Sequence, residues 1–196
     1  MKLFTLLILL SFNTYALNPG DKAPDFNLID QNGKNFKLSS LKNQFVVLEW
    51  FNHGCPYVKK HYGSNHMQTI QALYGHSDLV TWVTILSSAK GKQGYLGSDE
   101  EVISKMNELG IKSKYFLRDT DGKVGQLYGA KTTPHMYIID AKMKLRYVGA
   151  IDSVVSTNTS DIKGATNYVT SALSKLMLNE EPSPAKTKPY GCSVKY

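Results

Sequence analysis

One stretch of the sequence decides the fold: Trp50-Phe51-Asn52-His53-Gly54-Cys55-Pro56-Tyr57-Val58-Lys59. It overlaps the apolar run 45–51, which is typical of a strand buried on both faces. It leads into a helix-like pattern over 55–74. Cys55 therefore lies where a buried strand gives way, through a short turn, to a helix. Pro56 suits the first position of that helix because it has no N–H that would need a partner.

Cys55 is the candidate attacking thiolate, because the amides at a helix N-terminus and the helix macrodipole favour an anion there. They lower the pKa of a thiol from about 8.5 toward neutral pH. Lys59 and Lys60 lie in the first turns and add positive potential, so we expect His53, Pro56 and Lys59 to tune the thiol. The alternative is an inert buried cysteine, which is common for this residue type.

The rest of the chain alternates between strand-like and helix-like patterns, without internal repeats. Such alternation, ending in a strand pair and a helix, predicts an α/β sandwich around a mixed sheet. A doubly wound nucleotide-binding fold is the competitor, but no glycine-rich phosphate loop follows a predicted strand. The expected elements are a hairpin of 25–30 and 36–38 around Asn32-Gly33, strands at 45–51, 79–86, 116–117, 136–139 and 145–148, helices at 55–74, 99–109, 124–128 and 161–178, and a loop at 87–97.

The two ends of the chain differ from its middle. Residues 1–16 combine Lys2, an apolar run and small residues up to Ala16, which is the pattern of a secretory signal peptide, and the run is too short to span a bilayer. We therefore expect a signal peptide at 1–16, one domain at 17–178, and a proline-rich linker with a cysteine-containing tail at 179–196. The protein would be secreted or periplasmic, without a transmembrane span. The alternative for the first segment is a buried N-terminal helix.

Composition excludes several classes of protein. With 196 residues, 42% of them hydrophobic and 20% charged, the chain is long and apolar enough for one folded domain. Two cysteines rule out a disulfide-dense scaffold and a four-cysteine zinc site. The net charge is +7, but the lysines are scattered and only Arg118 and Arg146 are arginines, so we expect no nucleic-acid partner.

Several segments together resemble the redoxin or AhpC/TSA branch of the thioredoxin-like superfamily, which includes peroxiredoxin-like and TlpA-like proteins. The stretch around Cys55 is similar to the thioredoxin active-site segment, and 20–26 with the following hairpin is similar to the opening of this branch. Residues 130–140 resemble its cis-proline strand, and 190–196 are similar to a Gly-Cys-Ser-hydrophobic-Lys-aromatic ending found in a subgroup. The resemblance covers about residues 19–196 and implies a thioredoxin-like fold, with a mixed central sheet flanked by helices and an N-terminal β-hairpin extension.

The resemblance also implies roles for individual residues. A cis peptide bond between Thr133 and Pro134 would turn the Thr133 backbone toward Cys55 and leave a strand edge as a platform for substrate. Glu49, six residues before Cys55, occupies the position where thioredoxins keep a buried acid. Its pKa would be raised, so it would accept the thiol proton. The alternatives are a trans loop proline and a solvated Glu49 near a sheet edge.

The departures from the family pattern matter as much. Val58 stands where a local Cys-x-x-Cys motif would have its second cysteine, so Cys55 has no neighbouring thiol to resolve it. Leu48 and Asn52 stand where a peroxiredoxin has Pro and Thr, which argues against an efficient peroxidase. Cys192, on the tail, is the candidate resolving thiol. It could equally serve as a structural staple with Cys55, pair with another subunit, or stay free.

These features predict a thiol-disulfide oxidoreductase. It would need no organic cofactor, and it would act on protein or small-molecule thiols and disulfides. One alternative is a thiol peroxidase in which peroxide oxidises Cys55 to sulfenic acid. Another is a copper-binding or partner-binding module without catalysis, since thiolate, imidazole and thioether groups suit copper. The side chains that suggest copper near Cys55 are those of His53, His61, His66, His135, Met67 and Met136.

Overall fold

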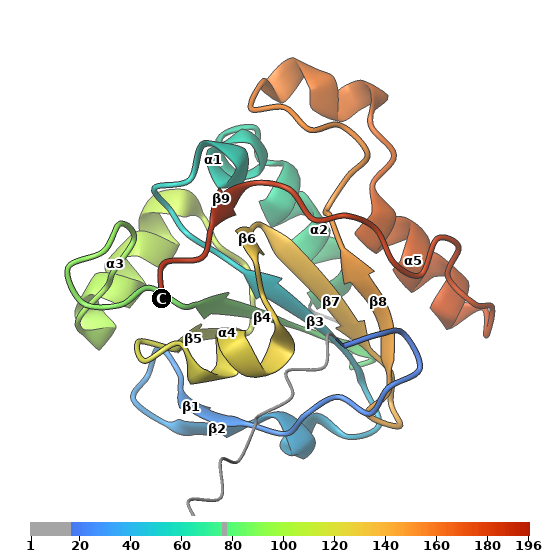
Figure 1. Ribbon diagram of the computed structural model, residues 1–196, viewed down its shortest axis with the longest axis horizontal. Coiled ribbons are helices and arrows are strands. Elements are labelled where there is room, and N and C mark those ends of the chain that lie inside the picture. Colours follow the sequence, from blue (N-terminus) through green and yellow to red (C-terminus); the bar gives the residue numbers. More distant parts are fainter. Residues whose placement is uncertain (1–16, 76–77) are drawn as a thin grey trace, which may run out of the picture.

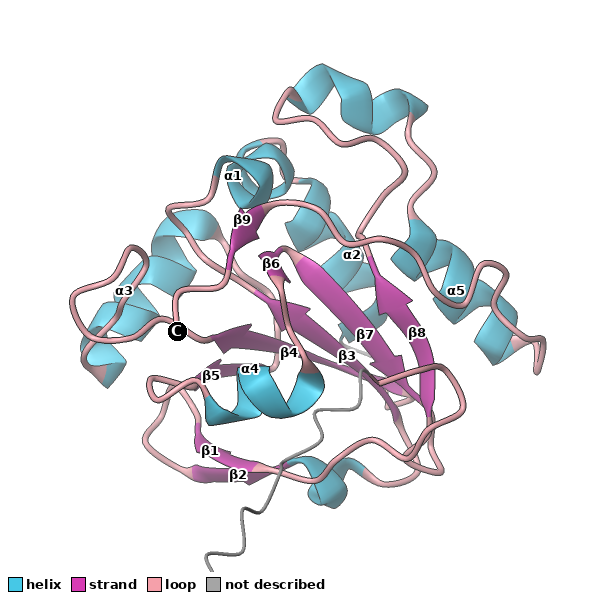
Figure 2. Cartoon of the chain, in the orientation of Figure 1, coloured by secondary structure: helices cyan, strands magenta, loops and turns pink. Residues whose placement is uncertain are grey.

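A seven-stranded mixed sheet forms the centre of the protein, which we describe from a computed structural model covering residues 17–75 and 78–196 (Figures 1 and 2). The predicted signal peptide at 1–16 lies outside the described residues. The strands of this sheet, in spatial order, are β2 (Asn35–Lys37), β1 (Asn27–Ile29), β5 (Tyr115–Arg118), β4 (Val80–Leu86), β3 (Phe45–Trp50), β7 (His135–Ile139) and β8 (Leu145–Gly149). β3, β4 and β5 run parallel, and the other pairings are antiparallel.

Helices cover both faces of the sheet (Figure 2). They are α1 (Pro56–Gly63), α2 (His66–Gly75), α3 (Asp99–Leu109), α4 (Lys123–Tyr128) and α5 (Tyr168–Met177), with short 3-10 turns at Leu38–Leu41 and Thr159–Gly164. β3 is buried on both faces, as its apolar run predicts: Val47 packs with side chains of α1, α2 and α5, whereas Val46 and Leu48 pack with those of α4 and the hairpin. The predicted α/β architecture is therefore confirmed.

Two predicted helices are each interrupted. The pattern over 55–74 forms α1 and α2 rather than one helix, because Asn65 adopts a left-handed conformation (φ +60°), which Asn tolerates better than most residues. The pattern over 161–178 forms a 3-10 turn and then α5, because Asn167 is extended and its side chain accepts the N–H of Thr170. An Asn that caps a helix in this way starts a new helix instead of continuing the old one.

Other local predictions are confirmed. β1 and β2 form the hairpin around Asn32-Gly33, and α3 begins after Ser98, whose hydroxyl accepts the N–H of Glu101. α3 ends at Gly110, which has the positive φ of +61° that favours glycine. Within the described residues, none of the helices has the length and apolar composition that crossing a membrane would require.

The C-terminal segment returns across the molecule to the central sheet (Figure 1). Beyond α5, Val148 in β8 donates its N–H to Ala185 and accepts from the N–H of Thr187. The chain then forms β9 (Cys192–Ser193), which pairs antiparallel with the short strand β6 (Thr132–Thr133). Figure 1 shows β9 beside β6 and close to the start of α1. The tail thus reaches the end of the molecule where Cys55 lies.

Candidate functional site

Cys55 is the N-cap residue of α1, and Pro56 is the first residue of that helix, as predicted. Its backbone N–H donates to Asn52, and its carbonyl accepts from Val58 and Lys59, which fixes the turn between β3 and α1. The Cys55 side chain is completely buried, with an exposed fraction of 0%. Its thiol is therefore held rigidly at the helix N-terminus.

The Thr133-Pro134 bond is cis, as the resemblance implied. The Thr133 carbonyl accepts a hydrogen bond from the Cys55 thiol at 3.0 Å. The Thr133 hydroxyl is buried and has no hydrogen-bond partner among the described residues. When Cys55 ionises, the thiol can no longer donate to the carbonyl, and this hydroxyl is a donor close to the new charge.

Cys192 lies directly opposite Thr133 in the β6–β9 pair, so the tail brings the second cysteine to the first. Both cysteines are free thiols in this structure. The strand edge at Thr133, which we expected to be open for a substrate strand, is occupied by the chain's own tail. Sequence reasoning placed Cys192 on a tail after a proline-rich linker but did not predict this strand pairing.

The two thiols have opposite pKa shifts. Burial raises the pKa of Cys55. Once the thiol has ionised, however, the thiolate can accept hydrogen bonds from the Cys192 thiol, the Thr133 hydroxyl and the Val58 amide, and together these lower the pKa. Burial, the hydrogen bond to Cys55 and repulsion from its charge raise the pKa of Cys192 to about 11. Of the two thiols, Cys55 therefore loses its proton more readily than Cys192.

A buried polar cluster fixes the tail just before Cys192. The Tyr190 hydroxyl donates to Asp152, and the buried Lys60 ammonium donates to Asp152 at 3.0 Å and to the Val154 carbonyl at 3.0 Å. The Lys60 nitrogen also lies 5.8 Å from the centre of the Tyr190 ring. Lys60, predicted only to add positive potential, in fact binds the tail through Asp152.

Gly191 allows the final approach to the site. Its φ is +130°, and a Cβ added there would lie 2.0 Å from the Thr133 carbonyl oxygen. On the other side of Cys192, the Val194 N–H donates to Lys131, and the Tyr196 hydroxyl donates to Ala130 at 2.8 Å. The tail is therefore anchored on both sides of Cys192.

Glu49 is fully buried on the central strand β3, so the alternative of a solvated carboxylate at a sheet edge is wrong. Its carboxylate accepts hydrogen bonds from Tyr62, Gln71, Trp82 and Thr84. Burial raises its pKa to about 7 in spite of these donors. In the described part of the chain, the side-chain hydrogen bonds of Glu49 go to these four residues and not to Cys55.

His53 lies in the turn before α1, and Lys59 lies within α1. They line a groove of about 430 Å³ together with residues of α1 and α3, among them Val58, Lys105 and Leu109. Burial and the charge of Lys105 lower the pKa of His53, which is therefore neutral at pH 7. Lys59 is exposed.

The histidines that suggested copper lie in separate places. His61 and His66 contact each other through their Nδ1 atoms at 2.9 Å, beside Asp152. His135 lies next to the cis-proline, with its Nδ1 toward Tyr137. Across residues 17–75 and 78–196, no three His, Cys, Asp or Glu side chains are grouped as a metal ion would require.

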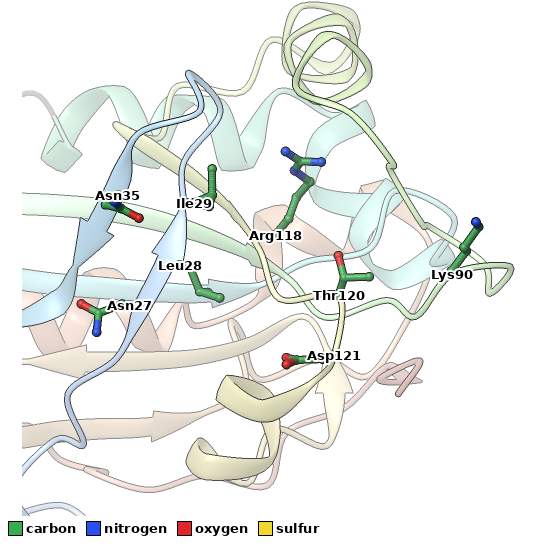
Figure 3. Close-up of a pocket in the computed structure, with 8 residues that line it drawn as sticks. All are labelled: Asn27, Leu28, Ile29, Asn35, Lys90, Arg118, Thr120 and Asp121. Atoms are coloured by element: carbon green, nitrogen blue, oxygen red, sulfur yellow. The ribbon is translucent and has the colours of Figure 1, made fainter.

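A further hollow lies at β1 and the loop after β5, and neither cysteine lines it (Figure 3). The charged side chains there are those of Lys90, Arg118 and Asp121, and Arg118 forms an ion pair with Asp99. This hollow is separate from the thiol site.

The fold and a cysteine at the start of α1 define a redox protein of the thioredoxin-like class. The model of the AhpC/TSA family matches residues 19–148, about two thirds of the chain, and the protein belongs to this family.

Known proteins with similar sequence or structure support this assignment. The thiol-disulfide oxidoreductase ResA of Bacillus subtilis is 26% identical over 131 residues, which cover 62% of this chain and 73% of ResA. An uncharacterised conserved protein of Geobacillus kaustophilus superposes with a TM-score of 0.74 at 25% identity, covering 91% of this chain and 92% of that one. The thioredoxin domain of a Bacteroides vulgatus thiol-disulfide oxidoreductase superposes with a TM-score of 0.55 at 15% identity, covering 76% of this chain and 98% of that one. The predicted thioredoxin-like fold is confirmed.

Proposed function

We propose that this protein is a thiol-disulfide oxidoreductase in which Cys55 and Cys192 form the redox pair. One observation carries the proposal: β9 pairs with β6 so that Cys192 lies opposite Thr133, whose carbonyl contacts the Cys55 thiol. The opposite pKa shifts of the two thiols assign the attacking role to Cys55 and the resolving role to Cys192. The similarity to ResA agrees with this activity.

The reaction follows from these roles. The Cys55 thiolate attacks one sulfur of a substrate disulfide, and the other substrate sulfur leaves as a thiolate. Cys192 then loses its proton and attacks the Cys55 sulfur of the mixed disulfide. The second substrate thiolate leaves, and a Cys55–Cys192 disulfide remains. The substrate disulfide gains two electrons, and the protein dithiol loses two.

Glu49 is the proton acceptor in this proposal. A carboxyl group with a pKa of about 7 takes up and releases protons readily at neutral pH. It lies on the same face of the sheet as Cys55, since Val47 and Phe51 on either side of it pack in the core that includes Cys55. Thr133 and Pro134 form the substrate platform beside the thiol when β9 is displaced from β6, and His53, Pro56 and Lys59 lie around the start of α1.

The proposal includes export and the domain limits expected from the sequence: a signal peptide at 1–16, the redox domain at 17–178 and the cysteine-bearing tail at 179–196. An oxidising compartment would suit a protein whose two cysteines pair. Two alternatives stay predictions. Consumption of hydrogen peroxide with a thiol donor would indicate the peroxidase, and copper uptake lost in Cys55→Ser would indicate the metal-binding module.

The decisive test measures alkylation of Cys55 by iodoacetamide as a function of pH, in wild type and in Cys192→Ala. We expect the Cys55 pKa to be lower than that of an ordinary thiol in wild type and higher in Cys192→Ala than in wild type, because alanine has no group that donates to the thiolate. Peptide mapping of the oxidised, non-reduced protein should show a Cys55–Cys192 peptide. An unperturbed Cys55 pKa without this peptide would refute the proposed function.

A further inference from the structure

The two sulfurs differ in their access to solvent. Cys55 has an exposed fraction of 0% and belongs to the hydrophobic core with Phe51 and Val58. Cys192 is only partly buried and packs against the edge of that core, and the next residue, Ser193, is exposed. A molecule that arrives from outside while the tail is docked therefore meets Cys192 before Cys55.

The docked tail also limits which molecules can approach. An extended substrate strand needs a free backbone edge, and the edge of β6 is already paired with β9. The contacts of Tyr190 and Tyr196 hold the tail on both sides of Cys192. A small thiol, or a protein thiol on a protruding loop, needs no free strand edge.

We propose that the thiol that reduces the oxidised protein attacks the sulfur of Cys192 and not that of Cys55. This inference rests on the proposed function, because it requires the Cys55–Cys192 disulfide. It assigns Cys192 a second role, as the site that receives electrons from a reducing thiol. The donor class is a low-molecular-mass thiol or a protein dithiol with an accessible cysteine.

The step is balanced in atoms and electrons. The donor thiolate forms a bond with the Cys192 sulfur while the Cys55–Cys192 bond breaks, and Cys55 leaves as a thiolate. A second donor thiolate then attacks the donor sulfur of this mixed disulfide. Cys192 leaves and takes up a proton, and the two donor thiols end as one donor disulfide. Two electrons thus return to the protein.

The pKa of the leaving thiol also favours attack at Cys192. A thiol with a lower pKa leaves faster in thiol-disulfide exchange. Attack at Cys192 expels Cys55, whose pKa is lowered, whereas attack at Cys55 would expel Cys192, whose pKa is raised to about 11. Solvent access and the leaving-group pKa therefore both favour attack at the Cys192 sulfur.

The test places charge beside each sulfur and measures how fast the oxidised protein is reduced. Ser193→Lys and Ser193→Glu differ by two charges next to Cys192. Glu108→Lys makes a change of two charges on the groove that lies beside Cys55, at an exposed residue of α3. The probes are glutathione, an anionic thiol, and 2-mercaptoethanol, a neutral one that reports any change in the disulfide itself.

We expect glutathione to reduce the oxidised Ser193→Lys protein about tenfold faster than Ser193→Glu at low ionic strength, with a smaller ratio in high salt. The rates with 2-mercaptoethanol should be equal within about twofold, and Glu108→Lys should match wild type with both thiols. A glutathione effect at Glu108 and none at Ser193 would overturn the inference and leave the proposed function intact. Oxidised protein without the Cys55–Cys192 disulfide would overturn both.

Discussion

Replacing Gly191 by alanine tests whether strand pairing of the tail creates the redox pair. A Cβ at this position would lie 2.0 Å from the carbonyl oxygen and 2.8 Å from the carbonyl carbon of Thr133, closer than real Cβ contacts, so the backbone of β9 must move away from β6. The φ of +130° adds conformational strain for any residue with a Cβ. Gly191→Ala should therefore move Cys192 away from Cys55.

The magnitude follows from these two effects. Holding a non-glycine residue in such a conformation costs about 1–3 kcal/mol, and the clash with the Thr133 backbone shifts the sum toward the upper end. Since about 1.4 kcal/mol is a factor of ten, we expect the equilibrium constant for forming the Cys55–Cys192 disulfide to fall about 10- to 100-fold. This corresponds to a reduction potential about 30–60 mV more positive.

The assay equilibrates the protein in glutathione redox buffers, stops exchange with acid, and counts free thiols by alkylation and mass spectrometry. The matched control is Gly164→Ala, because a Cβ there meets nothing within 4 Å and Gly164 has no positive φ. The control should keep the wild-type potential. An unchanged potential in Gly191→Ala would refute the claim that this approach of the tail positions Cys192.

Three further changes test the buried charges. The pKa of Glu49 is raised from 4.5 to about 7, so the folded state holds the proton more tightly and stability falls as pH rises through this window, by about 3 kcal/mol in total. Glu49→Gln should abolish this dependence in urea unfolding between pH 4.5 and 8, and a slope equal to wild type would contradict the shift. Lys60→Met leaves Asp152 buried without its cation and should lower the unfolding free energy by about 3–5 kcal/mol. The control Lys59→Met, at an exposed position, should change it by less than about 0.5 kcal/mol, and equal effects of the two variants would refute the role of burial. Tyr190→Phe removes the hydrogen bond to Asp152, so hydrogen exchange of the tail amides should quicken by about fivefold, and unchanged exchange would show that this bond does not hold the tail.

Local patterns predicted most of the fold because its elements obey local rules. The apolar run of β3, the cap at Ser98 and the left-handed Gly110 are each determined by a few neighbouring residues. The interruptions at Asn65 and Asn167 were missed for the opposite reason: the apolar spacing continues across both, and one backbone angle or one side-chain hydrogen bond ends the helix. An Asn within an otherwise regular helical pattern was the available signal.

The site was predictable only where it lies in one segment. Cys55 and Pro56 follow from the strand-to-helix transition, and the structure places them as expected. The cluster that holds the tail joins Lys60 to Asp152 and Tyr190, which are 92 and 130 residues away in the sequence, and no local pattern encodes such a contact. Gly191, beside Cys192, was the one visible hint that the chain passes close to another backbone.

The position of the second cysteine bears on the direction of electron flow. A disulfide within a Cys-x-x-Cys motif closes a loop of a few residues, whereas Cys55 and Cys192 are separated by 137 positions (192 − 55). In the chain-entropy model, a disulfide that closes so long a loop stabilises the folded state by about 5 kcal/mol. By linkage, folding stabilises this disulfide over the dithiol by the same amount. Because the tail is already docked in the dithiol form, with Cys192 opposite Thr133, most of the ordering is complete before the bond forms. A disulfide favoured in this way gives the dithiol form a strong tendency to donate electrons, so we expect the proposed reaction to run as a reduction of the substrate disulfide, and the return of electrons through Cys192 to require a strongly reducing thiol.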